Sequence, residues 1–93
     1  MTRVRWAPQA VEDLQSIRSY IARDSIEYAD LIVDQIVEAV ERVETHPRSG
    51  RMVPELGLSS IREVIVRSYR IVYLLEGDDA FILTVFHGAR PFP

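Results

Sequence analysis

The sequence predicts an α+β domain in which an antiparallel helical hairpin packs on one face of a mostly antiparallel sheet, in the order β-α-α-β-β-β. Three observations support this prediction. The chain has 93 residues and 47% hydrophobic content, which suffices for one small core. Its first half carries two apolar stripes with helical spacing, and its second half carries three runs typical of strands. Residues 1–93 are therefore expected to form a single domain.

The first three elements follow one another closely. RVRW, residues 3–6, alternates charged and apolar side chains and predicts a short strand. Pro8 suits the first turn of a helix, because a missing N–H costs nothing there, and we expect this helix over about 8–23. Ser25 is an N-cap candidate for a second helix that ends near residue 45, before Pro47. Both helices need a flat surface to cover their apolar stripes: Ala10, Leu14, Ile17, Ile21; and Ala29, Ile32, Val33, Ile36, Val40, Val43.

The second half supplies that surface. IREVIV (61–66) is rich in β-branched residues, YRIVYLLE (69–76) follows, and GDD (77–79) predicts a tight turn before AFILTVFH (80–87). The last two runs are apolar on both faces, so they are expected to be central strands. Residues 46–60 show no pattern and predict an irregular loop, which either serves a function or simply crosses to the sheet edge.

Composition excludes several classes of function. The chain has no cysteine and no lysine, which removes thiolate metal sites, a thiol nucleophile and a lysine general base. The net charge of −3 argues against a nucleic-acid coating role. We see no signal peptide and no membrane-length apolar run, so we expect a cytoplasmic protein that needs no metal and no cofactor.

Polar residues in the strand-rich half are the candidates for a site. Alternation places Arg62 with Val64 and Val66, and Arg70 with Val72 and Leu74. An arginine in so apolar a strand either serves a function or lies along the sheet with its head at the edge, paired to Glu63 or Glu55. Arg70 is the strongest functional candidate, because its sequence neighbours Tyr69 and Ile71 are typical of a core.

The last strand ends in FHGARPFP (86–93), where His87 is expected to share a face with Phe81, Leu83 and Val85. Arginines gathered with a histidine on one sheet face would bind a phosphate or a carboxylate. Cleaving RNA further requires a base, an acid and a charge stabiliser within reach of one another. No acid partner is evident, so we predict no catalytic residue. The binding candidates are Arg62, Arg67, Arg70, His87 and Arg90.

The chain resembles the RelE/ParE superfamily of bacterial toxins from type II toxin–antitoxin systems over essentially its whole length. The resemblance rests on VRW in the first strand, on HPRSGRMVPEL after the second helix, on YRIVY at 69–73 and on HGAR at 87–90. It also rests on the pattern A-x-x-DL-x-x-I-x-x-YI in the first helix, formed by Ala10, Asp13, Leu14, Ile17, Tyr20 and Ile21.

The superfamily divides into RelE-like nucleases, which cut mRNA on the ribosome, and ParE-like toxins, which poison DNA gyrase. Arg70 and Arg90 match two arginines of the RelE-like pattern, but Glu63 and Ile65 stand where that pattern has lysines. Phe92, the tail aromatic, has no ionisable group. The loop residues Pro47, Gly50, Arg51, Pro54, Glu55 and Leu56 are closer to the ParE-like branch.

The resemblance therefore implies a ParE-like toxin that inhibits gyrase by binding and is neutralised by a ParD-like or similar antitoxin. It implies neither sequence-specific nucleic-acid binding nor membrane attachment. Two alternatives stay open: a RelE-like mRNA interferase, and a degenerate toxin that only binds antitoxin. The expected antitoxin contacts lie on the helical hairpin, at Leu14, Ile17, Tyr20, Ile21 and Ile36.

Overall fold

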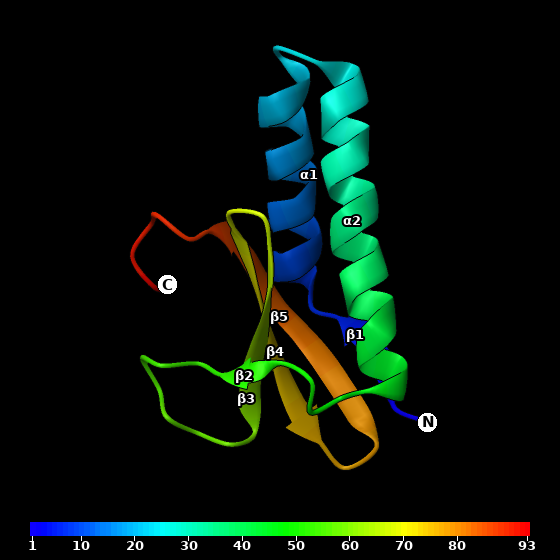
Figure 1. Cartoon of the computed structure of the whole chain (residues 1–93), viewed down its shortest axis with the longest axis vertical. Coiled ribbons are helices and arrows are strands. Elements are labelled where there is room, and N and C mark those ends of the chain that lie inside the picture. The colour runs from blue at the N-terminus through cyan, green and yellow to red at the C-terminus, as the bar shows by residue number, and fades with distance from the viewer.

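In the computed structural model, which describes all 93 residues, two helices lie on one face of a five-stranded sheet (Figure 1). This arrangement confirms the predicted α+β fold and the predicted element order. The loop after β2 (residues 53–60) and the tail (88–93) project from the sheet on the side away from the helices. The elements are β1 (Arg3–Trp6), α1 (Pro8–Ala22), α2 (Ile26–Thr45), β2 (Arg51–Met52), β3 (Ile61–Val66), β4 (Tyr69–Glu76) and β5 (Asp79–His87).

The strands lie in the order β1-β5-β4-β3-β2. Strand β1 runs parallel to β5, and every other neighbouring pair is antiparallel. Strands β4 and β5 are interior, as their apolar faces predicted. Strand β2 was not predicted, because two residues within an irregular segment give no periodic signal; it pairs with β3 at Glu63 and Arg62.

The helical hairpin forms as its capping residues dictate. Ser25 is the N-cap of α2, and its Oγ accepts a hydrogen bond from the backbone N–H of Tyr28 at 3.1 Å. Pro8 stands at the start of α1. The apolar stripe of α2 is buried against the sheet, and α1 adds Leu14, Ile17 and Ile21 as half-buried side chains. The buried core between the two layers comprises Ala10, Ile32, Ile36, Ala39, Val40, Val43, Ile71, Tyr73, Ala80, Ile82 and Val85.

A β-bulge changes which residues of β5 face the helices. Val72 lies opposite Thr84 while Tyr73 lies opposite Ile82, so Leu83 is an extra residue and the alternation shifts there. The prediction that His87 shares a face with Phe81 and Leu83 is therefore wrong. His87 instead lies on the helix side with Val85, and its ring meets Tyr69 edge-on at 5.4 Å between centroids.

Helix α1 covers β5 where β1 has ended. Strand β1 pairs only with residues 79–82 of β5, which leaves the outer edge of the next residues open. The Asp13 carboxylate of α1 bonds to this open edge. Its Oδ2 accepts hydrogen bonds from the Val85 N–H, at 3.0 Å, and from the Thr84 hydroxyl. Asp13 thus takes the place of a missing neighbouring strand and fixes α1 against the sheet.

The predicted irregular segment 46–60 is held firmly by one buried tyrosine. The Tyr73 hydroxyl donates to the Pro47 carbonyl at 2.7 Å and accepts from the Gly50 N–H at 3.1 Å. A Cβ atom on Gly50 would lie 2.5 Å from that hydroxyl oxygen and 2.7 Å from the Glu63 carbonyl oxygen, so only glycine fits. Neither helix of the fold has the length and apolar character needed to cross a membrane.

Candidate functional site

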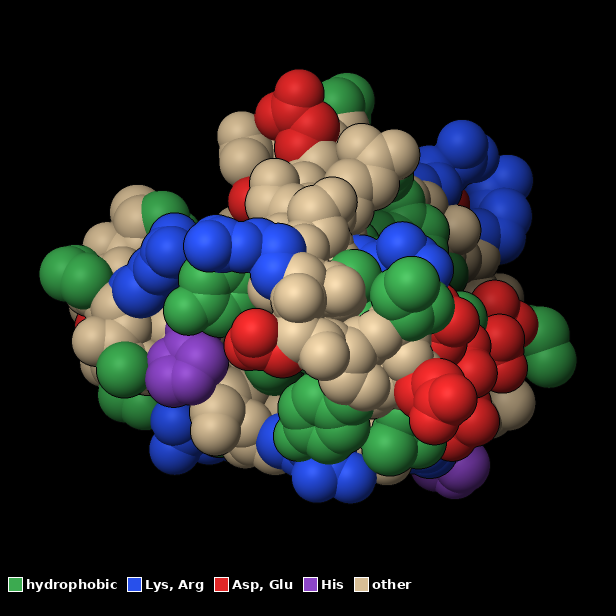
Figure 2. Space-filling view, turned by 90° about the horizontal axis from the view of Figure 1, so that it is seen from above, with side chains coloured by type: hydrophobic (Ala, Val, Ile, Leu, Met, Phe, Trp, Pro, Cys, Tyr) green, Lys and Arg blue, Asp and Glu red, His purple; other side chains and the backbone are tan.

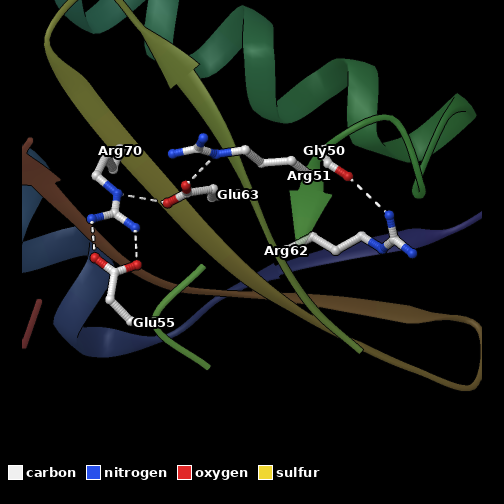
Figure 3. A network of polar contacts seen from close by, with 6 residues as sticks. All are labelled: Gly50, Arg51, Glu55, Arg62, Glu63 and Arg70. Carbon is white, nitrogen blue, oxygen red and sulfur yellow. Dashed lines mark hydrogen bonds and ion pairs between the residues drawn. The ribbon is translucent and has the colours of Figure 1, made fainter. Parts of the chain in front are cut away.

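The site candidate ranked first by sequence, Arg70, lies on the sheet face away from the helices, in the network of Figure 3. Its Nη1 and Nη2 donate to the two oxygens of Glu55 at 2.8 and 2.7 Å, and its Nε donates to Glu63 Oε1 at 2.7 Å. The bidentate geometry is the strongest that a guanidinium makes with a carboxylate. The expected pairing to Glu63 or Glu55 is therefore present, with both partners engaged at once.

Glu63 connects Arg70 to a second arginine. Its side chain has no exposed surface, and its Oε2 accepts from Arg51 Nε at 2.7 Å (Figure 3). Strand pairing sets this up, because Arg51 lies directly opposite Glu63 and β4 places Arg70 on the same face. Two carboxylates thus balance two guanidinium groups. Every polar atom of Glu63 is satisfied, which a fully buried charge requires.

These contacts shift proton affinities in opposite directions. Hydrogen bonds from Arg70 lower the pKa of Glu55 to about 2. Hydrogen bonds to Glu55 and then to Glu63 raise the pKa of the Arg70 guanidinium above its already high value. Glu55 and Arg70 are therefore both charged at neutral pH, and Arg70 cannot act as a proton donor there.

Two aromatic rings cover the same guanidinium. The Arg70 Cζ lies 5.1 Å from the ring centroid of Phe86 and 5.4 Å from that of Phe92, and the two rings meet edge-on. Only 11% of the Arg70 side chain remains exposed. Since Phe92 belongs to the C-terminal tail and Glu55 to the segment after β2, Arg70 ties both to the sheet.

The sequence candidates do not all gather at one point, because Arg62 and Arg90 lie outside the hollow that the other three line. Arg62 points to the helix side near Tyr73 and donates to backbone carbonyls of Gly50 and Ser59, both at 3.0 Å, so it braces the segment before β3. Arg62 therefore does not share the sheet face on which Arg70 lies. Arg67 adopts a left-handed conformation (φ 53°) in the turn after β3 and donates to Gln35 Oε1 at 2.7 Å.

Arg67, Arg70 and His87 do line one open hollow of about 420 Å³, which Arg51 also enters. Three residues of this basic hollow were predicted as binding candidates from the sequence. Arg51 was not, because its position depends on strand β2, which the sequence did not predict. His87 is exposed, and its Nδ1 accepts from the Ala89 N–H at 3.0 Å, which leaves Nε2 as its outward-facing nitrogen.

Of the four arginines among the candidates, Arg90 alone makes no salt bridge and no side-chain hydrogen bond. It lies between two grooves, one of about 620 Å³ on the open face of the sheet and one of about 510 Å³ between α1 and the end of β5. Of the residues expected to contact an antitoxin, Ile17 and Tyr20 line the second groove. Leu14 and Ile21 are half-buried at the core.

Ile36 does not qualify as a contact residue in this structure, because its side chain is completely buried between α2 and the sheet. Ile36 belongs to the apolar stripe of α2, and this stripe forms the core and not the surface of the hairpin. Of the exposed apolar residues in the hairpin, Tyr20 is the most accessible, at 69%.

The arrangement supports binding of anions more readily than proton transfer. Burial raises the pKa of the Tyr69 phenol beside His87, so this phenol stays protonated at neutral pH and is no general base. No three histidine or acidic side chains converge in a way that could hold a metal ion. On the face seen in Figure 2, arginines alternate with acidic and apolar side chains and form no continuous basic surface.

The fold matches solved components of toxin–antitoxin systems. A chain of the chromosomal ParDE system from P. aeruginosa aligns with a TM-score of 0.77 at 22% identity, covering 94% of this chain and 96% of that one. A chain of the RelBE2 toxin–antitoxin complex from Mycobacterium tuberculosis aligns with a TM-score of 0.66 at 21% identity, covering 92% and 96%. These two likenesses show that the chains share one fold.

The sequence defines the family more closely. The Y4kP protein of Sinorhizobium fredii is 33% identical over 93 residues, covering 98% of this chain and 93% of that protein. The family model described as "ParE toxin of type II toxin-antitoxin system, parDE" matches residues 4–92. The chain therefore belongs to the ParE toxin family, within the RelE/ParE superfamily, as its motifs predicted.

Proposed function

We propose that this protein is a toxin that inhibits DNA gyrase by binding and cuts no nucleic acid itself. The observation that supports this most is the state of Arg70, the arginine that a RelE-like nuclease would direct at phosphate. Here Glu55 and Glu63 engage it from two sides and two phenylalanine rings cover it. A phosphate would have to displace a bidentate carboxylate to reach it.

The electrostatics of the same network point in this direction. The charges of Arg51 and Arg70 are cancelled by those of Glu55 and Glu63, so the network offers little attraction to an RNA backbone. No carboxyl group lines the basic hollow with His87, so the hollow holds no carboxylic acid–imidazole pair. Three candidate side chains remain exposed to a macromolecular target: Arg67, His87 and Arg90.

We further propose that a cognate antitoxin of the ParD or a similar class neutralises the toxin in the cytoplasm. The groove between α1 and the end of β5 combines apolar walls at Ile17, Tyr20 and Val85 with the His87 imidazole and the Arg90 guanidinium, which also line it. Such a groove suits a partner segment that is apolar on one side and acidic on the other.

The test is a gyrase reaction with relaxed plasmid and ATP, to which purified toxin is added. We expect supercoiling to be lost and cleaved linear DNA to accumulate once the gyrase is denatured. Arg67→Asn should weaken both effects, since asparagine tolerates the left-handed turn while the charge is removed. Arg48→Asn, at an exposed arginine outside the basic hollow, is the matched control. Gyrase that is unaffected at large toxin excess overturns the proposal.

A second function, ribosome-dependent mRNA cleavage, is favoured by the basic hollow that contains Arg67, Arg70 and His87. It predicts position-specific cuts in mRNA on translating ribosomes, lost in Arg70→Ala or His87→Ala. Message that stays intact in that assay removes this candidate. Growth that continues normally when the toxin is induced without antitoxin would instead favour a chain that only binds antitoxin.

A further inference from the structure

We propose that the toxin docks on gyrase with the end of the molecule where the β3–β4 turn and the end of β5 meet the helical hairpin. The partner patch that fits this end carries carboxylates around an apolar or aromatic side chain. The inference rests on the proposed function and adds to it the contact surface and the chemistry of the partner. We call this region the tyrosine–arginine surface, and its members are Tyr20, Tyr28, Arg67, Tyr69, His87 and Arg90.

His87 joins the two halves of this surface. It lies opposite Tyr69 in the pairing of β4 with β5, and the two rings meet edge-on at 5.4 Å between centroids. His87 lines the groove beside α1 together with Tyr20 and Arg90, and it also lines the basic hollow together with Arg67. The two hollows therefore adjoin at His87 and present one surface to a partner.

Arg67 is held in position for a contact. Its backbone is left-handed (φ 53°), a conformation that arginine rarely adopts. Its Nε donates to Gln35 Oε1 at 2.7 Å, and its guanidinium carbon lies 5.9 Å from the ring centroid of Tyr28. Backbone strain of this kind occurs mostly at binding and active sites. A guanidinium that is already fixed also loses less freedom when a partner binds.

The hairpin exposes apolar side chains beside this position. Tyr20, Ile26, Tyr28 and Leu31 are all exposed, whereas α2 exposes no large apolar side chain after Leu31. The guanidinium carbon of Arg23 lies 5.6 Å from the ring centroid of Tyr20, so each of the two exposed tyrosines stacks with an arginine. In Figure 1 this end of the hairpin projects beyond the β3–β4 turn. Tyrosine and arginine are the residues that most often dominate the binding energy of protein interfaces.

Charge indicates the chemistry of the partner. Arg23, Arg67 and Arg90 form no ion pair with a carboxylate of this chain. Guanidinium groups without a partner favour carboxylates on the incoming surface. A nucleic-acid backbone fits less well, because the chain has a net charge of −3 and the exposed acids Asp24 and Glu27 lie close to Arg23 in the sequence. We therefore assign the surface to a protein partner.

The test measures the affinity of the purified toxin for immobilised gyrase in the absence of DNA. Tyr28→Ala should weaken binding by at least about tenfold, as expected for a tyrosine that dominates an interface. Leu58→Ala, which truncates a side chain of similar exposure in the loop after β2, should leave the affinity unchanged. Arg23→Gln should also weaken binding, and Arg48→Gln is its control. Equal affinity for the wild type and Tyr28→Ala overturns the inference.

The first turn of α2 tolerates the change at Tyr28, because alanine is a strong helix former and the tyrosine side chain is exposed. Circular dichroism and the melting temperature verify the fold, and Tyr20→Ala is a second variant that should lose affinity in the same direction.

The outcomes separate this inference from the proposed function. A wild-type chain that inhibits gyrase while Tyr28→Ala and Tyr20→Ala bind equally well overturns the surface alone. A wild-type chain that neither binds nor inhibits gyrase overturns the proposed function, and this assignment with it. Binding that requires DNA and disappears after nuclease treatment shows a nucleic-acid contact and contradicts the protein partner.

Discussion

Glu63→Gln tests whether the network around Arg70 stabilises the fold. Glu63 is fully buried and accepts two charge-assisted hydrogen bonds of 2.7 Å, from Arg70 Nε and from Arg51 Nε. Glutamine has nearly the same shape, but its amide nitrogen would face a guanidinium N–H and one of the two bonds is lost. Breaking a buried ion pair on one side costs about 3–5 kcal/mol.

We place the loss at about 3 kcal/mol, the lower end of that range, because Arg70 keeps Glu55 and Arg51 is half-exposed. For a chain of this size, such a loss lowers the melting temperature by roughly 12–24 °C. Urea unfolding at pH 7, followed by the fluorescence of the single tryptophan Trp6, measures the free energy directly.

The matched control is Asp79→Asn, the same carboxylate-to-amide change in an exposed pair. Asp79 accepts from Arg3 and Arg5, whose side chains are 67% and 55% exposed, so we expect a loss below about 1 kcal/mol. If Glu63→Gln costs no more than Asp79→Asn, then the network contributes no stability and the reasoning about Arg70 is refuted.

Three further predictions concern the segment after α2. Because the pKa of Glu55 falls from 4.5 to about 2 on folding, its ion pair with Arg70 stabilises the fold fully above pH 4.5 and is lost as the pH drops toward 2. Between these two pH values, the melting temperature should therefore fall less in Glu55→Gln than in the wild type. Gly50→Ala should cost about 1–3 kcal/mol in chemical unfolding, since its Cβ meets the Tyr73 hydroxyl; a neutral result contradicts this packing. Tyr73→Phe leaves the Gly50 N–H and the Pro47 carbonyl without their partner, and calorimetry should show a loss of about 1–3 kcal/mol, whereas an unchanged transition would mean that water replaces the hydroxyl.

The parts of the fold that could be predicted are those that depend on residues close together in the sequence. The helical stripes, the Ser25 cap and the β-branched run of β3 each reflect neighbours within a few residues, and the structure has these elements within one residue of their predicted bounds. The interior place of β4 and β5 also followed from side chains that are apolar on both faces.

The parts that were missed depend on contacts distant in sequence. The bulge at Leu83 turns His87 to the helix side, and only the pairing of β5 with β4 reveals it. Arg62 braces a loop because β2 pairs beside it, and β2 is too short to leave a pattern. Ile36 was mistaken for a contact residue because an apolar stripe looks the same whether a sheet or a partner covers it.

The sequence predicted which residues belong to the candidate site, but not how they contact one another. The sequence indicated Arg70 and both of its possible partners, yet it could not show that Glu55 and Glu63 bind it together. It also gave no sign that Phe92, which lacks ionisable chemistry, covers the guanidinium. Those two facts show that the Arg70 guanidinium is already paired with carboxylates and covered by aromatic rings.

The most direct test of the central claim compares two reactions at the same toxin concentration: supercoiling by gyrase, and cleavage of mRNA on translating ribosomes. The account predicts that the wild-type chain blocks supercoiling, accumulates gyrase-cleaved DNA and leaves the message intact, because Arg70 is bound by Glu55 and Glu63. Message cut at specific positions while gyrase works normally would contradict the account.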